Sequence, residues 1–206
     1  MKYILVIFAF FLPMTIFADN GMNIIDLWND VKIPEKFEPI PVKVDPSSTA
    51  LLILDIEKRT VPQRPRAVAA VPNIKKLLEW ARTGGILVAY SITRASTPDA
   101  ILPEVKPQED ELVVQAGVDK YFGTDLEKHL KDHNITTVII TGTAAEGAVL
   151  ATMIGSVIRG MRVILPVDGM PSSELYAEQY VVWHALHAPG TKGNVTVTKI
   201  NLISLQ

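Results

Sequence analysis

Four short segments of this 206-residue chain carry polar residues whose types and spacing suit chemistry on a small molecule. They are 55–59, 91–94, 115–120 and 142–148. The last reads Gly-Thr-Ala-Ala-Glu-Gly-Ala at the start of a predicted helix, where free backbone N–H groups can receive a carboxylate or a developing oxyanion. Asp55 and Glu146 could divide the acid and base roles of a paired-carboxylate site. The chain contains no cysteine, so any chemistry proceeds without a thiol.

Short apolar runs precede these segments, and they are too hydrophobic for half-exposed strands. We predict buried parallel strands at 49–55, 86–92, 111–115, 137–141, 162–167 and 195–200. Helices are predicted at about 71–85, 124–133, 146–160 and 172–188. This alternation predicts an α/β fold, a single-domain open parallel sheet with helices on both faces. Because the carboxyl ends of such strands form the ligand crevice, the four polar segments should meet there.

The N-terminal 48 residues lack the alternation of strands and helices predicted for the rest of the chain. Residues 1–18 predict a secretory signal sequence, because one lysine is followed by an apolar run of about fifteen residues, too short to span a bilayer. Residues 19–48 are rich in proline and predict an extended lead-in on the surface of a domain formed by 49–206. We therefore expect an exported protein, periplasmic or extracellular, with no membrane association after cleavage of the signal.

Charge and composition exclude several partners. The formal net charge is −2, which provides no electrostatic footprint for nucleic acid or anionic lipid. Without cysteine, stability after export depends on core packing and not on disulfides.

The polar connection at 93–111 is long for a compact domain and is typical of a functional loop. Within this region Arg94, like Arg59, could pair with an anionic ligand or remain solvated.

Three segments carry a family resemblance: TALLILD at 49–55, GGILVAYSI at 84–92, and 122–173, within which ITGTAAEGAV is followed by RGMRVILPVDG. Together they resemble the isochorismatase-like cysteine hydrolase superfamily. The resemblance implies a parallel sheet flanked by helices, cleavage of amide, carbamate or enol-ether bonds in small molecules, and oligomers with sites near subunit boundaries. It also implies a cis peptide around Thr143 and Ala144 that orients N–H donors.

The resemblance further implies a catalytic triad of aspartate, lysine and cysteine. Asp55 matches the aspartate at the end of the first strand. Ala148 stands at the cysteine position, six residues after Gly142. An ungapped reading places Gln115 at the lysine position, whereas Lys120 can take that position if the loop is shortened. A methyl group cannot perform the thiolate attack on which the ordinary mechanism depends.

Histidines and aromatic residues offer weaker candidates. His129 and His133 have a spacing compatible with zinc, but histidines near a helix end act more often as cations that favour the C-terminus. The helix predicted at 172–188 carries a stripe of aromatic and histidine side chains, which we expect to form core or subunit contacts. The stripe comprises Tyr176, Tyr180, Trp183, His184 and His187. Asp168 could equally cap a turn or contact a ligand. We therefore predict no metal and no cofactor.

Three functions remain open from the sequence. The first is an exported, homo-oligomeric protein that binds a small molecule at Thr143, Ala144, Gly147 and Arg94 and has lost thiol catalysis, as a binding protein or pseudoenzyme. The second is a hydrolase without a covalent intermediate, in which Asp55 or Glu146 positions water and the turn stabilises an oxyanion. Whichever function holds, Glu146 could serve only to stabilise the helix start. The third is a structural subunit whose late aromatic helix serves assembly.

Overall fold

The computed structural model describes residues 23–206, so the predicted signal sequence at 1–18 lies outside the described residues. The chain divides into two units, Met1–Lys36 and Phe37–Gln206. In the described part of the first unit, Trp28–Asp30 forms a single 3-10 turn, η1. No helix within residues 23–206 is both long enough and apolar enough to cross a bilayer.

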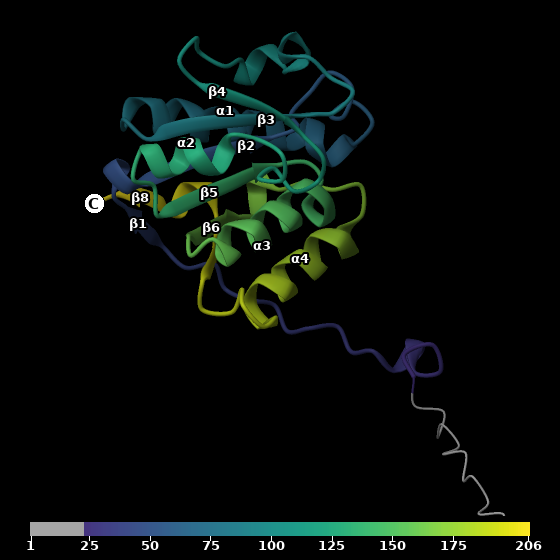
Figure 1. The fold of residues 1–206 in the computed structure, drawn as a ribbon. Helices are drawn as coiled ribbons and strands as arrows, with labels where there is room; N and C mark the ends of the chain where they lie inside the picture. Colours follow the sequence, from purple (N-terminus) through teal and green to yellow (C-terminus); the bar gives the residue numbers. More distant parts are fainter. Residues whose placement is uncertain (1–22) are drawn as a thin grey trace, which may run out of the picture. The chain divides into compact units, whose positions relative to one another are not determined.

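Six parallel strands form the sheet of the second unit (Figure 1). Their order across the sheet is β4-β3-β2-β5-β6-β7. The strands are β2 (Thr49–Leu54), β3 (Leu87–Thr93), β4 (Leu112–Ala116), β5 (Thr137–Gly142), β6 (Arg162–Pro166) and β7 (Val195–Thr198). The prediction of an open parallel sheet is confirmed. Every residue of β2 is buried, as expected for a central strand covered on both faces.

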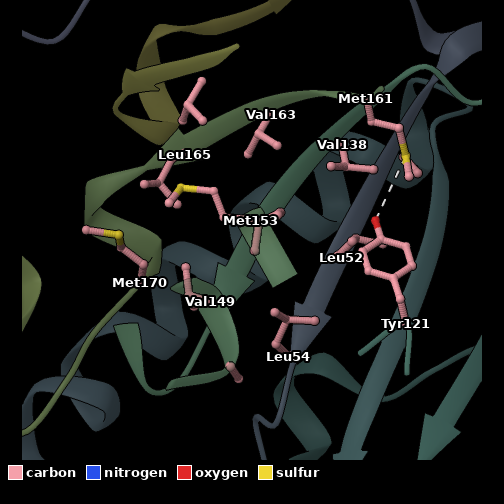
Figure 2. Packing of buried hydrophobic residues seen from close by; sticks show 14 of the residues in the cluster. Leu52, Leu54, Tyr121, Val138, Val149, Met153, Met161, Val163, Leu165 and Met170 are labelled. Atoms are coloured by element: carbon pink, nitrogen blue, oxygen red, sulfur yellow. Dashed lines mark hydrogen bonds between the residues drawn. The ribbon is translucent and has the colours of Figure 1, made fainter. Parts of the chain in front are cut away.

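Helices cover both faces of this sheet (Figure 1). They are α1 (Pro65–Thr83), α2 (Leu126–Asp132), α3 (Leu150–Ile158) and α4 (Leu175–His187). Alternation along β2 sorts its side chains between two cores. Leu51 and Ile53 pack with α1, whereas Leu52 and Leu54 pack with residues of α2, α3 and α4. Figure 2 shows the second of these cores, where Met153 of α3 lies among residues of β2, β5 and β6.

Short elements complete the unit. The 3-10 turns are η2 (Pro46–Ser48), η3 (Pro98–Ala100), η4 (Pro103–Val105), η6 (Val167–Gly169) and η7 (Ile200–Leu202). A two-stranded parallel sheet joins β1 (Val42–Val44) to β8 (Ile203–Leu205). The lead-in is therefore not irregular throughout, and Val44 is part of the core beside α1. A three-residue run between prolines is too short to display a period, which is why the sequence did not reveal β1.

The first helix begins earlier than predicted. It starts at Pro65, and Pro72 lies within it. A helix at about 71–85 would have put Pro72 near its first turn, where the missing N–H of proline is normally tolerated. Ala67, Ala70 and Val71 extend the buried face of α1 toward its true start, so packing outweighs the cost of an interior proline.

Gly142, the last residue of β5, permits a close approach of two strand ends. Its φ is 126°, and a Cβ built on it would lie 2.0 Å from the carbonyl oxygen of Leu54. That oxygen accepts a hydrogen bond from the N–H of Thr143 at 3.0 Å. Only glycine combines this backbone conformation with this contact.

We expect Gly142→Ala to destabilise the protein by about 3 kcal/mol or more, since neither the backbone clash nor the positive φ can be relieved by a side-chain rotation. Thermal or denaturant unfolding measures the effect. Gly147→Ala is the matched control, because no atom lies within 4 Å of its built Cβ, and its stability should stay within about 0.5 kcal/mol of wild type. Equal stability of the two variants would contradict the close approach.

Candidate active site

A buried ion pair lies at the carboxyl edge of the sheet. The Lys120 Nζ is 2.7 Å from Oδ2 of Asp55, and the two side chains are 1% and 8% exposed. Ser91 of β3 donates its hydroxyl to the other carboxylate oxygen, Oδ1, at 2.7 Å. Lys120 also donates to the carbonyl of Gly117 at 2.7 Å. The pair thus joins the residue after β2 to the connection between β4 and α2.

Asp55 has an unusual backbone conformation. Its φ is 54°, in the left-handed region that residues with a side chain rarely occupy. Two contacts hold it there, because its N–H donates to the Ser91 carbonyl at 3.1 Å and its carbonyl accepts the Thr60 hydroxyl at 2.6 Å. Residues held in such conformations cluster at functional sites, where the surrounding structure determines them.

Burial raises the pKa of the Asp55 carboxyl above its usual value. The Lys120 ammonium and the hydrogen bonds from Lys120 and Ser91 oppose this rise, while the nearby Glu57 carboxylate adds to it. Glu57 is itself fully buried, and its carboxylate accepts the Thr93 N–H at 2.5 Å and the Thr93 hydroxyl at 3.3 Å. Asp55 therefore interacts with one cation, Lys120, and with a second buried carboxylate, Glu57.

Tyr121, the residue after Lys120, anchors the loop between β4 and α2 to α3. The Tyr121 hydroxyl lies 2.8 Å from Oγ of Ser156, and the Arg159 guanidinium lies 4.3 Å from the centre of the tyrosine ring. A Cβ on Gly155 would approach this ring to 3.0 Å. Figure 2 shows Tyr121 within the core, with its hydroxyl directed at the sulfur of Met161. Burial raises the pKa of Tyr121 to about 12.

A sharp turn follows β5, the strand that pairs with β2 and therefore ends beside Asp55. The Thr143–Ala144 peptide is cis, as the family resemblance implied. A π-helical turn, η5 (Ala145–Val149), then leads directly into α3. The Ala144 N–H donates to no group among residues 23–206. Ala148 contributes only a buried methyl group within this turn.

The structure corrects the position assigned to Gln115. Its side-chain amide donates to the carbonyls of Arg94 and Ser96, at 3.1 and 2.7 Å, and so holds the loop after β3. Lys120 pairs with Asp55 instead. The ungapped reading failed because β4 ends at Ala116 and the following loop, shorter than that reading assumed, returns Lys120 to the sheet edge.

Glu146 and the other turn residues have separate partners. The Glu146 carboxylate accepts the Ser172 hydroxyl at 2.6 Å and makes no hydrogen bond to Asp55. The Gly147 N–H donates to the Ala144 carbonyl at 3.1 Å, so it is less available to a ligand than the N–H of Ala144.

Arg94 is exposed, with its guanidinium beside Gly117. Asp168 accepts the N–H of Ile200, the first residue of η7, at 2.9 Å, so its carboxylate stabilises a turn that is distant in sequence and not the turn that directly follows it.

The histidines and aromatic residues lie outside this arrangement. Among residues 23–206 no group of three or more metal-ligating side chains occurs. The rings of His129 and His133 lie 4.6 Å apart. The late stripe is not core, since Tyr176 and Trp183 are 75% and 42% exposed. Glu57 is the residue that the sequence reasoning missed, although its position two residues after Asp55 was a usable signal.

A parallel α/β sheet with an Asp–Lys pair and a cis turn at its carboxyl edge defines the class of protein. The isochorismatase domain family matches residues 49–197, and the chain belongs to this family. It is 34% identical over 117 residues to the uncharacterized isochorismatase family protein YrdC of Bacillus subtilis, covering 50% of this chain and 63% of that relative. It is 26% identical over 130 residues to N-carbamoylsarcosine amidase of Arthrobacter, covering 50% of this chain and 49% of the amidase.

Solved structures share the fold. An isochorismatase-like hydrolase from Alkaliphilus metalliredigens superposes with a TM-score of 0.66 at 24% identity, covering 75% of this chain and 95% of the other. A nicotinamidase from Staphylococcus aureus superposes with a TM-score of 0.66 at 18% identity, covering 74% of this chain and 99% of the nicotinamidase. The chain thus spans nearly the full length of these structures, but less than two thirds of YrdC and of the amidase.

Removing either partner of the ion pair should destabilise the protein by about 3–5 kcal/mol, because the other charge is then buried without compensation. Lys120→Met and Asp55→Asn measured by denaturant unfolding test this, and the double variant should lose less than the two single variants combined. Lys128→Met is the control, since Lys128 pairs with Asp132 in solvent and should have no measurable effect. Additive losses would contradict a coupled pair.

Glu57→Gln should lower the pKa of Asp55, because it removes a like charge while an amide oxygen can still accept the Thr93 N–H. Carbon-13 NMR of the aspartate carboxyl groups during a pH titration measures the change. The exposed Glu109→Gln is the control and should leave the titration unaltered. An Asp55 pKa that rises or stays constant in Glu57→Gln would show that the two carboxylates do not interact.

Proposed function

We propose that this protein is exported and binds a small carbonyl compound at the Asp55–Lys120 edge without thiol catalysis, as a binding protein or pseudoenzyme of its family. One observation carries the proposal. The acidic and basic partners and the cis turn are assembled, yet the residue at the cysteine position is Ala148 and the chain has no cysteine. A site with its polar frame intact and no nucleophile suits recognition better than covalent turnover.

The polar groups of the edge define the ligand. The unpaired Ala144 N–H can donate to a carbonyl oxygen or a carboxylate, and the ammonium of Lys120 adds positive potential. The names of two similar proteins, N-carbamoylsarcosine amidase and nicotinamidase, direct attention to small amides and carbamoyl compounds. Assembly of the protein into a homo-oligomer belongs to the same proposal, since the exposed aromatic stripe of α4 offers a contact surface.

A second candidate is hydrolysis by water. The intact ion pair and the raised pKa of Asp55 favour it, because a carboxylate with a raised pKa is a better general base. In this mechanism Asp55 accepts a proton as the water oxygen bonds to the carbonyl carbon. The oxyanion that forms accepts the Ala144 N–H. Collapse of the intermediate breaks the bond to the leaving group, which takes up the proton.

Calorimetric titration with nicotinamide and N-carbamoylsarcosine, together with hydrolysis of 4-nitrophenyl acetate, tests the proposal. We expect binding of at least one amide, and no acyl group attached to the wild-type chain by mass spectrometry. Ala148→Cys should gain an acyl adduct, because the turn and Lys120 favour a thiolate there. Ala151→Cys, on α3, is the matched control and should acquire the adduct far more slowly.

Two results would change this conclusion. A wild-type protein that binds none of the probes while Ala148→Cys remains unreactive would contradict a ligand site at this edge. Steady turnover by the wild type that disappears in Asp55→Asn would replace the binding role with the water-based hydrolase.

A further inference from the structure

Thr143 carries a buried hydroxyl that has no hydrogen-bond partner within residues 23–206. The residue is 3% exposed. A buried hydroxyl without a partner is costly, and native proteins satisfy almost all such groups with protein atoms, ordered water or a ligand. Thr152 shares this property, so the place of Thr143 in the fold has to show whether a molecule other than the chain can be the partner of its hydroxyl.

The backbone places Thr143 at the candidate site. The Thr143 N–H donates to the carbonyl of Leu54 at 3.0 Å, and Leu54 immediately precedes Asp55. The cis peptide joins Thr143 to Ala144, whose N–H is also unpaired among the described residues. Two unsatisfied polar groups on adjacent residues thus stand beside the strand end that carries the aspartate.

The other polar groups of the edge are largely occupied. Both carboxylate oxygens of Asp55 accept hydrogen bonds, from Ser91 and from Lys120. The ammonium of Lys120 donates to Asp55 and to Gly117, which leaves one of its three N–H groups. The hydroxyls of Ser91 and Thr93 already donate to carboxylates, whereas the hydroxyl of Thr143 has both its donor and its acceptor capacity unused among the described residues.

We propose that Thr143 Oγ1 is a ligand-contacting residue that determines specificity. It binds a water molecule in the free site and a polar atom of the ligand that displaces this water. Because its neighbour Ala144 offers an N–H, the two groups together suit a carbonyl compound with a hydroxyl or amino group next to the carbonyl carbon. An α-hydroxy amide has this pattern, whereas a simple alkyl amide lacks the second polar atom. This inference rests on the proposed function and specifies its ligand.

Binding of lactamide and propanamide, measured by calorimetry, separates the two proposals. The wild type should prefer lactamide by about five- to tenfold, the value of one hydrogen bond. Thr143→Val, which keeps the shape and removes the hydroxyl, should bind both amides equally, and Thr143→Ser should retain the preference. Thr152→Val is the control, because Thr152 has a buried, unpartnered hydroxyl within α3, and it should behave as wild type.

Each outcome bears on one proposal. If the wild type binds neither amide, the proposed function is contradicted for amides. If Thr143→Val retains the wild-type preference, the role of Thr143 alone is overturned. A crystal structure of the free protein decides the role of Thr143 independently of any amide. An ordered water within about 3.2 Å of Thr143 Oγ1 supports it, and a hydroxyl with no such neighbour overturns it.

Discussion

The buried ion pair between Asp55 and Lys120 is the interaction on which the site depends. Two charges removed from water are tolerated only when each compensates the other and their remaining hydrogen bonds are satisfied. Ser91 and Gly117 supply two of those bonds, and one N–H of the Lys120 ammonium remains beyond them. The pair therefore ties β2, β3 and the loop after β4 into one arrangement, and anything that moves one of these elements also moves the charges.

The helix α3 connects the two sides of the site. Its N-terminal end continues the turn that contains Ala148. Further along the helix, Gly155 packs against the ring of Tyr121 and Ser156 lies within hydrogen-bond distance of its hydroxyl; Tyr121 is the residue after Lys120. The turn that contains Ala148 and the loop that contains Lys120 are thus both attached to this one helix. The recognition role that we propose would give a function to these buried charges, whose removal from water is costly.

Much of this could be predicted from the sequence, for physical reasons. Residues 50–54 are all apolar and directly precede Asp55, so both the burial of this run in a parallel sheet and the position of Asp55 at the edge followed. The choice between Gln115 and Lys120 did not follow, because loop length decides which side chain reaches the edge, and no periodicity reports it. Glu57 was overlooked for a similar reason, since a charged residue after a strand usually faces solvent, whereas Thr93 provides this carboxylate with two hydrogen-bond donors.

Nitrogen-15 NMR of the lysine side chains at neutral pH tests the central claim most directly. The account predicts one ammonium signal, from Lys120, whose protons exchange slowly with water and show a through-space contact to Asp55, while the exposed lysines exchange rapidly. Rapid exchange of every lysine ammonium, with no contact to Asp55, would contradict the buried pair and the site built around it.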